Sequence, residues 1–412
     1  MSASINGAAQ LLRPPADGLP YLRHDRAAEL IVDGGSMWTD GELIAGFGRS
    51  AQANIQIDAG GCAVIPGFVD CHTHLPFAGW REREYELKIE GASYERIARE
   101  GGGIRASAGA LAAASDDQVL TQAEDLAVEM LTFGTTAFEC KSGYGLSVEG
   151  ELRSLHLARR LADRVAQTTT STALLAHAVP DDYDADGWMD VVESMIPQVV
   201  KAGHVSALDI YVESVAFENR HLQRMGEFAV RHSLDLRAHV EQFNANHSVP
   251  VAVAAAARSV DHLACLADDE VGLLAEAETA AVLLPGAEFL GAERLAPARE
   301  LVDAGAICAL GSDLNPGTSP VASIPLVIGL AVRRYRWSVR EALLACTLNA
   351  AWILDRSDSA GSLEAGKRAD LLVLDGPLEQ IPYRLGHNPV AMVLVGGELV
   401  RIRSDCAWRV TR

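Results

Sequence analysis

The feature that most constrains the fold is a regular alternation of strand-like and helix-like segments between residues 65 and 364. Eight short apolar runs are separated by longer stretches with helical periodicity. The runs span residues 63–70, 135–139, 171–176, 207–212, 234–238, 259–261, 280–284 and 306–310. Eight strands that alternate with helices predict an α/β fold, a (β/α)8 TIM barrel. An open doubly wound sheet also alternates, but Gly101-Gly102-Gly103 follows a helix-like stretch, so a dinucleotide fingerprint is absent.

The two ends of the chain differ from this central part. Residues 29–47 and 369–402 contain brief apolar pieces separated by glycine-rich turns such as Asp33-Gly34-Gly35 and Gly396-Gly397. Such turns between short apolar runs are typical of hairpins. We therefore predict a small β-sandwich-like domain from residues 1–64 and 365–412, and a catalytic barrel over residues 65–364.

Composition excludes several classes of partner. The chain has 412 residues, 49% of them hydrophobic, which is enough for a sizeable core. Its net charge of -20 argues against nucleic acid and anionic membranes, since both require a basic face. Seven cysteines without C-x-x-C spacing indicate a reducing compartment. We find neither a secretory signal nor a membrane-spanning apolar run, and so expect a cytoplasmic protein.

Polar residues follow the apolar runs at nearly every expected strand end. The carboxyl ends of barrel strands meet at one rim, where the active sites of this fold lie. Only the seventh run ends without an ionisable residue, in Pro285-Gly286. The other ends carry His72 and His74, Lys141 to Gly145, His177, Glu213, His239 to Gln242, Asp261 and His262, and Ser312 to Gly317. We expect the histidines away from this rim, His24 and His221 among them, to be solvated.

Four of these residues could hold a metal ion. A single histidine at a strand end is more often structural, but five that converge on one rim would be costly to bury without a ligand. The imidazoles of His72, His74 and His239 with the carboxylate of Asp313 suit one divalent ion, zinc or iron, with a position left for water. Asp313 could also hold the attacking water, and His262 is the candidate proton shuttle.

Short motifs, in the same order along nearly the whole chain, carry a resemblance to a known family. The broad part is PGFVDCHTH at residues 66–74, with later histidines after strands five and six and an aspartate after strand eight. The narrower part consists of FAGWR, GASYERIAREGGGI, KSGYGL, AHAVP, HVEQ, LLPGAEFL, SDLNPGTSP and GSLEAGKRADLLVLD. By the first the chain resembles the amidohydrolase superfamily, and by the second it is similar to the imidazolonepropionase family.

The resemblance implies a reaction as well as a fold. The fold would be a TIM barrel of the metal-dependent hydrolase type, in a protein expected to be a homodimer. The substrate would be 4-imidazolone-5-propanoate and the product N-formimino-L-glutamate, an intermediate of histidine degradation. Metal-bound hydroxide would attack the ring carbonyl, and the C–N bond would then break as a proton reaches nitrogen.

The resemblance also implies roles for individual residues. His72, His74, His239 and Asp313 match metal ligands, and His262 matches a catalytic histidine. Arg81 and Tyr144 match residues that hold the propionate, for which an arginine fork is suited. His177 matches a residue beside the ring carbonyl. Asn315, Gly317 and Thr318 match the substrate-contacting loop after strand eight.

One departure and several alternatives remain open. Where some relatives have glutamate three residues after the strand-five histidine, this chain has Gln242, which cannot exchange a proton but can hydrogen-bond the substrate. Glu241 is expected to turn away from the site. The main alternative is a related cyclic amidohydrolase or deaminase that acts on another carboxylate-bearing heterocycle. A carbamylated Lys141 that bridges two metals, and a non-catalytic scaffold, are less favoured.

Overall fold

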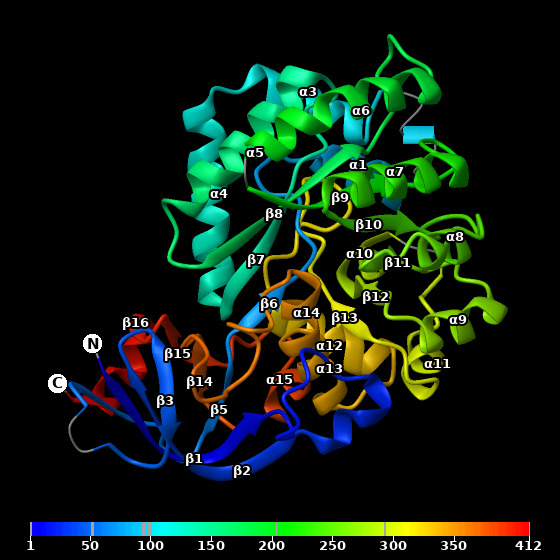
Figure 1. Ribbon diagram of the computed structural model, residues 1–412. Helices are drawn as coiled ribbons and strands as arrows, with labels where there is room; N and C mark the ends of the chain where they lie inside the picture. Colours follow the sequence, from blue (N-terminus) through cyan, green and yellow to red (C-terminus); the bar gives the residue numbers. More distant parts are fainter. Residues whose placement is uncertain are drawn as a thin grey trace.

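Eight parallel strands form the central barrel of the computed structural model, which describes residues 2–50, 53–92, 96–97, 101–202, 204–291 and 294–411 (Figure 1). Neighbouring strands follow chain order, and a parallel bridge between Thr73 and Leu314 joins the last strand to the first. The strands are β6 (Phe68–Asp70), β7 (Thr135–Lys141), β8 (Thr168–Ala176), β9 (Val205–Tyr211), β10 (Asp235–Val240), β11 (Ser259–His262), β12 (Ala280–Leu283) and β13 (Cys308–Leu310). The predicted TIM barrel is therefore confirmed.

Helices surround the barrel and cover the outer faces of its strands (Figure 1). Those between or after the barrel strands are α1 (Glu82–Ile89), α3 (Ile104–Ala113), α4 (Asp116–Thr132), α5 (Val148–Ala162), α6 (Ala185–Lys201), α7 (Asn219–His232), α8 (Val249–Ala254), α9 (Val271–Glu276), α10 (Pro285–Gly291), α11 (Ala298–Asp303), α12 (Ile324–Arg334), α13 (Val339–Ala345) and α14 (Leu348–Ile353). Serine caps begin several of them. Ser115 and Gln118, for example, form a reciprocal capping box at the start of α4.

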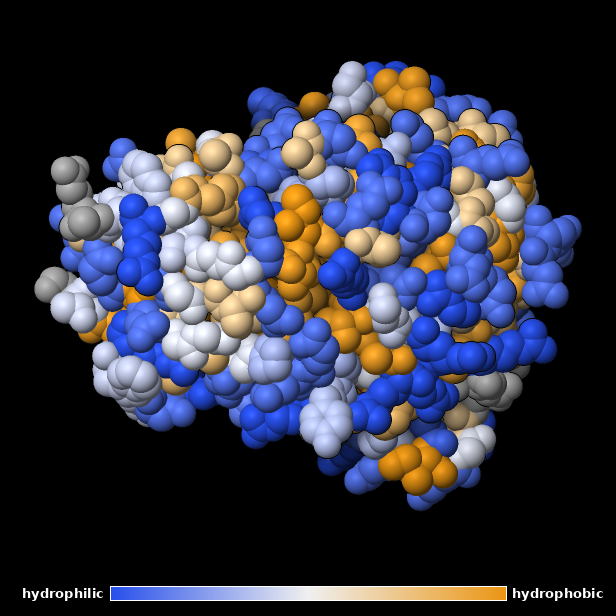
Figure 2. All heavy atoms as spheres, turned by 90° about the horizontal axis from the view of Figure 1, so that it is seen from below, coloured by the Kyte–Doolittle hydropathy of each residue, from blue (hydrophilic) through white to orange (hydrophobic). Residues whose placement is uncertain are grey.

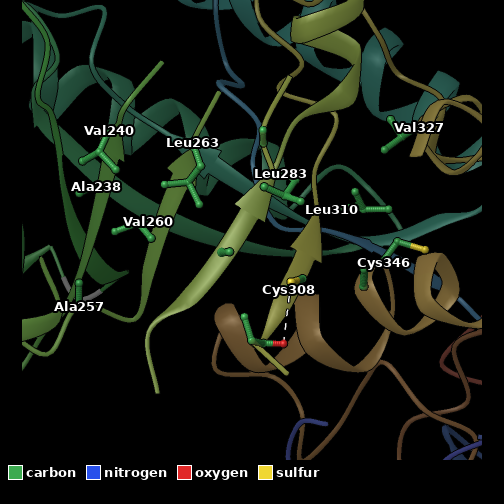
Figure 3. Packing of buried hydrophobic residues seen from close by; sticks show 14 of the residues in the cluster. Ala238, Val240, Ala257, Val260, Leu263, Leu283, Cys308, Leu310, Val327 and Cys346 are labelled. Carbon is green, nitrogen blue, oxygen red and sulfur yellow. Dashed lines mark hydrogen bonds between the residues drawn. The ribbon is translucent and has the colours of Figure 1, made fainter. Parts of the chain in front are cut away.

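Strand alternation separates the apolar shell from the polar interior of the barrel. Ala238 and Val240 on β10 belong to the same buried cluster as Leu310 on β13 and Val327 on α12 (Figure 3). Successive side chains of a strand point to opposite faces, so Arg237 and His239 face the other way. Aliphatic packing outside the strands therefore leaves their inner faces available for polar groups.

The two chain ends build one mixed sheet beside the barrel, as expected (Figure 1). Its strands are β1 (Ala3–Arg13), β2 (Ile31–Asp40), β3 (Leu43–Phe47), β4 (Ile55–Asp58), β5 (Ala63–Pro66), β14 (Leu371–Leu374), β15 (Val390–Val395), β16 (Glu398–Ile402) and β17 (Val410–Thr411). Leu371 and Val373 enter the core of this sheet, whereas Leu372 and Leu374 join the barrel cluster. Leu363 also lies in the sheet's core, just before the expected boundary. The division into two domains stays a prediction.

The first apolar run differs from the expectation. Residues 63–70 form not one strand but two, because β5 joins the terminal sheet and β6 starts the barrel. The break lies at Gly67, where a Cβ atom would come within 2.0 Å of the Thr136 hydroxyl oxygen. Only glycine allows this close approach, so one residue lets the run pass between two sheets.

The buried histidines include two that were expected to be solvated. His24, in a 3-10 helix (His24–Glu29), and His221, on α7, are each about 1% exposed. His24 lies against Cys308 and Glu341, where the segment between β1 and β2 packs on the barrel. The sequence places His24 in a loop, and that position gave no sign of its buried contacts with Cys308 and Glu341.

The surface and the cysteines add two observations. None of the described helices is long and apolar enough to cross a membrane. Seen from below, mostly hydrophilic residues cover the molecule, with apolar patches between them (Figure 2). All seven cysteines are free thiols, and all but Cys265 are buried.

Candidate metal and substrate site

Four of the predicted residues meet at the carboxyl ends of the strands. His72 and His74 follow β6, His239 lies on β10, and Asp313 follows β13. Asp313 Oδ1 lies 3.5 Å from His72 Nε2 and 3.3 Å from His74 Nε2. The rings of His72 and His239 are 4.6 Å apart. The structure thus brings the whole predicted ligand set together.

The donor atoms of this set fit a metal ion. One donor atom each of His72, His74 and Asp313 lies within 4.8 Å of the others. Nε2 of His72, Nε2 of His239 and Oδ2 of Asp313 are buried, yet none has a hydrogen-bond partner among the described residues. Unsatisfied buried polar atoms cost free energy, and a cation would satisfy all three at once. Imidazole and carboxylate ligands suit divalent zinc and iron alike.

Two carboxylates in the barrel interior hold two of the imidazoles. Asp261 Oδ2 lies 2.6 Å from His72 Nδ1, and Asp209 Oδ1 lies 3.1 Å from His239 Nδ1. Each contact fixes the Nδ1–H tautomer and turns Nε2 toward the site. Asp209 was missed in the sequence. It interrupts the apolar run Leu208-Asp209-Ile210, and a buried carboxylate there requires a partner.

His74 is held differently from the other two imidazoles. Its Nδ1 atom has no hydrogen-bond partner in the described part of the chain. Its ring stacks instead on His177, with centroids 5.2 Å apart and planes inclined by 19°. His177 is in turn fixed by a 3.0 Å contact from Nδ1 to the Gly143 carbonyl oxygen. The third imidazole is therefore positioned by packing rather than by a carboxylate.

Lys141 lies beneath these ligands inside the barrel. Its Nζ atom is 2.6 Å from Asp209 Oδ2 and 3.1 Å from Glu139 Oε2. Burial and the Arg237 guanidinium oppose its charge, but the surrounding carboxylates raise the pKa of Lys141 above its ordinary value. A carbamate would add a further anion among these carboxylates. Geometry and charge thus favour the ammonium over the carbamylated form.

Three positive backbone φ angles direct side chains at the rim. They occur at Glu241 (φ +53°), His262 (φ +83°) and Asp313 (φ +54°), and such non-glycine conformations concentrate at functional sites. Alternation along β11 would turn His262 outward after Asp261, but its φ angle breaks the pattern and the ring lines the cavity. The carboxylate of Glu241 accepts from the backbone N–H groups of Asn246 and Ser248, away from the cavity, as expected.

A small cavity lies at the metal donors, and His74, His239 and Asp313 form part of its wall. It brings together all the predicted substrate contacts except Gly317, and it adds Tyr211 and Ile104, which were not predicted. Tyr211 is the last residue of β9, and other site residues were predicted because they lie at such strand ends. The lining residues are His74, Arg81, Ile104, Tyr144, His177, Tyr211, His239, Gln242, His262, Asp313, Asn315 and Thr318.

Arg81 supplies a cationic group at this cavity. Its Nε and Nη1 atoms are buried without a hydrogen-bond partner among the residues described, and the carboxylate of Glu84 lies 3.7 Å from Nε. A Cβ atom at Gly317 would lie 1.8 Å from Arg81 Nη2. Glycine at 317 therefore leaves the space that the guanidinium occupies. The loop after β13 is thus shaped to accommodate the side chain of Arg81.

Asn315 organises the loop after β13. Its amide oxygen accepts from the N–H groups of Gly317 and Thr318, and its amide nitrogen donates to Asp313 O and Thr318 Oγ1, all within 2.8 Å. These four bonds use the full capacity of the side-chain amide. Asn315 thus shapes the cavity wall, and a direct contact between its side chain and substrate stays a prediction.

Burial favours the neutral form of two histidines on the cavity, His262 and His177. Burial lowers the pKa of His262 to about 3, although the nearby Asp313 acts in the opposite direction. Burial likewise holds the pKa of His177 well below its ordinary value. A neutral imidazole carries the lone pair that a proton shuttle needs, although a shuttle works best when its pKa lies near the working pH.

Comparison with known proteins agrees with this geometry. The sequence pattern of the amidohydrolase family (Amidohydro_1) matches residues 63–400. An imidazolonepropionase of Deinococcus radiodurans is 40% identical over 89% of this chain and 92% of its own length. An imidazolonepropionase of Geobacillus thermodenitrificans is 37% identical over 96% of this chain and 97% of its own.

Solved structures of lower identity share the fold. A triazine hydrolase variant superimposes with a TM-score of 0.76 at 18% identity, covering 97% of this chain and 94% of its own. A zinc-bound adenosine deaminase from Xanthomonas campestris gives a TM-score of 0.68 at 18% identity, covering 97% and 93%. At this identity the likeness concerns the fold alone. By sequence, the chain belongs to the amidohydrolase family and, within it, to the imidazolonepropionases.

Proposed function

We propose that the protein hydrolyses the ring amide of 4-imidazolone-5-propanoate to N-formimino-L-glutamate, a step of histidine degradation. The observation that carries this proposal is the Arg81 guanidinium, buried and without a hydrogen-bond partner among the described residues at Nε and Nη1, on the cavity that also holds the metal donors. A substrate with a carboxylate at one end and an amide at the other would satisfy both groups. The family membership supports the same substrate.

The proposed metal ligands are His72, His74, His239 and Asp313. A divalent ion held there lowers the pKa of a water molecule and polarises a carbonyl group. We propose one zinc or iron ion per chain, which is supported by the converging donor atoms. Asp209 and Asp261 would keep the imidazoles in the orientation that binding requires.

The proposed reaction opens the ring at its carbonyl carbon. The oxygen of water adds to this carbon, the ring C–N bond breaks, and a carboxylate forms. Asp313 would bind the ion through one carboxylate oxygen and hold the attacking water through the other. His262, a neutral imidazole on the same cavity, would accept the proton of water and transfer it to the departing nitrogen.

The remaining cavity residues would orient the substrate. Arg81 and Tyr144 are proposed to hold the propionate, and His177 to lie beside the ring carbonyl. Gln242 lines the cavity, and its side-chain amide makes no hydrogen bond to the described residues, so it would hydrogen-bond the ring. Gly317 and Thr318 belong to the loop that Asn315 shapes against Arg81.

The proposal extends to the state of the protein in the cell. We propose a cytoplasmic homodimer. The free cysteines support a reducing compartment. Light scattering on the purified protein measures its mass, and a mass of one chain would contradict the dimer.

The deciding experiment is an ultraviolet assay for the loss of imidazolonepropionate. The purified protein should consume the substrate and yield N-formimino-L-glutamate by mass spectrometry, whereas Asp313→Ala should not. Metal analysis of the same sample should give zinc or iron in stoichiometric amount. A metal-loaded protein that leaves imidazolonepropionate intact but opens another carboxylate-bearing ring would instead support the related cyclic amidohydrolase.

A further inference from the structure

A second group of metal-type donors lies in the barrel interior below the proposed metal site. One donor atom each of Asp209, His239 and Asp261 lies within 4.8 Å of the others, and all three residues are buried. His239 also belongs to the upper group with His72 and His262. Carboxylates are ligands that divalent ions accept, and His239 can add an imidazole nitrogen only after it loses the Nδ1 proton that it shares with Asp209. The lower group therefore has the composition of a metal site.

A protein cation already stands at this position. Lys141 Nζ lies 2.6 Å from Asp209 Oδ2 and 3.8 Å from Asp261 Oδ2. Glu139 Oε2 lies 3.1 Å from the same ammonium, yet this buried oxygen has no hydrogen-bond partner among the described residues. Lys141 itself is about 1% exposed. The ammonium is thus surrounded by three carboxylates and shielded from solvent.

The charges of this interior are nearly balanced by two basic side chains. Arg237 contacts Glu139 and lies 3.3 Å from Asp261 Oδ2, and it donates to the Cys71 carbonyl oxygen at 2.8 Å. Arg237 and Lys141 together face the carboxylates of Glu139, Asp209 and Asp261. Without the ammonium, one guanidinium would face three buried carboxylates, a state that strongly attracts a replacement cation.

We propose that the Lys141 ammonium occupies a latent second metal position and thereby limits this site to one divalent ion. The inference rests on the proposed metal site above it. A divalent ion beside the ammonium would be repelled at a few ångströms inside a buried, weakly screened interior. Lys141 also keeps the Asp209 carboxylate directed at His239. The residue therefore sets the metal count and supports one ligand of the remaining ion.

The test changes the charge and counts the metal. Lys141→Ala opens the position and leaves the carboxylates of Glu139, Asp209 and Asp261 around it, so zinc bound per chain should rise from one to two. Because this variant buries uncompensated carboxylates, Glu139→Gln with Lys141→Ala serves as the charge-balanced version, and it should also bind two. With Mn²⁺, paramagnetic resonance should show coupling between neighbouring ions in these variants alone.

Matched variants separate the possible causes. Lys141→Arg keeps a cation and should bind one ion. Lys367→Ala removes a lysine that pairs with Glu364, outside the barrel strands, at 2.7 Å and should also bind one. One ion of wild-type affinity in the charge-balanced variant would overturn the inference. A wild-type protein that binds no divalent ion would instead contradict the proposed metal site.

Discussion

The floor of the cavity and its substrate side are built on different plans. On the floor, His72 and His239 are fixed by Asp261 and Asp209, which are in turn held by buried cations. On the substrate side, Arg81 and Gln242 follow strands or precede helices, and Arg81 has buried donors without partners among the described residues. The fold thus orients the imidazoles of the floor by itself and leaves their Nε2 atoms for an ion, whereas on the substrate side the buried donors of Arg81 are left for a substrate.

Removal of a floor ligand should have the largest effect. Asp313→Ala removes a carboxylate that lies within 3.5 Å of His72 and His74. We expect turnover to fall by on the order of 10⁴-fold or more, with loss of bound metal, because ion and water would both lose a partner. Steady-state kinetics and metal analysis measure both. An active, metal-free Asp313→Ala protein would show that the floor does not hold a catalytic ion.

Removal of the cation on the substrate side should have the next largest effect. Arg81→Met keeps the bulk of the side chain but loses two charge-assisted hydrogen bonds, so kcat/KM should fall by roughly 10²-fold while metal content stays constant. A substrate analogue without the carboxylate provides the control. Equal loss for the analogue would reject a carboxylate contact and remove the contrast between the two sides.

A change beneath the floor should weaken the metal but not substrate recognition. Asp261→Asn keeps the shape of the side chain but weakens its hold on His72 Nδ1, now 2.6 Å away. Metal affinity by chelator competition should fall by about 10- to 100-fold, with KM of the metal-loaded enzyme unchanged. Asp370→Asn, in a buried carboxylate that accepts from Gly396 N, is the matched control and should not alter affinity.

The same contrast explains what the sequence could and could not predict. Barrel rims gather strand ends, so His72, His239 and Asp313 were identifiable from position alone. Asp209 was not, because its role depends on a contact with His239, 30 residues away. The inward turn of His262 depends on a φ angle that strand alternation does not contain.

Some residues allow more than one interpretation from the sequence, and only the structure decides between them. Gly67 looked like part of one strand, yet its close approach to Thr136 divides the run between two sheets. Asn315 is suited both to a turn and to a substrate contact, and its four hydrogen bonds show that it forms the turn. Pairwise contacts between distant segments decide such cases, and local patterns do not record them.

Gln242 offers a milder test of the substrate side. Gln242→Glu should remain folded, since position 242 is only partly buried on the cavity. If this position lies in the proton path, the variant's pH–rate profile should gain an ionisation, with kcat at neutral pH changed by less than about tenfold. Gln242→Met is the control without hydrogen bonds. A profile identical to wild type would place Gln242 outside the proton path.

The smallest effect on catalysis should come from His24, which belongs to neither side of the cavity. Cys308 N–H donates to His24 Nδ1 at 3.2 Å, and Nε2 lies 3.1 Å from the Glu341 carbonyl oxygen, so the ring is held in its neutral form. Burial lowers the pKa of His24 to about 4. The unfolded chain, with its ordinary pKa near 6.5, therefore binds the proton more readily than the folded one between these values.

This difference makes the stability of the protein depend on pH in one direction. The contribution of His24 is complete above pH of about 6.5 and is lost as the pH falls toward 4. Between pH 7.5 and pH 5 the wild type should lose about 2 kcal/mol more free energy of unfolding than His24→Gln, at roughly 1.4 kcal/mol per pH unit. Urea unfolding of both proteins at the two pH values measures this, while kcat at pH 7.5 should be the same. An equal fall in the free energy of unfolding of both proteins would mean that His24 has the same pKa in the folded and unfolded states. The contact of His24 with Cys308 and Glu341 would then be open to water.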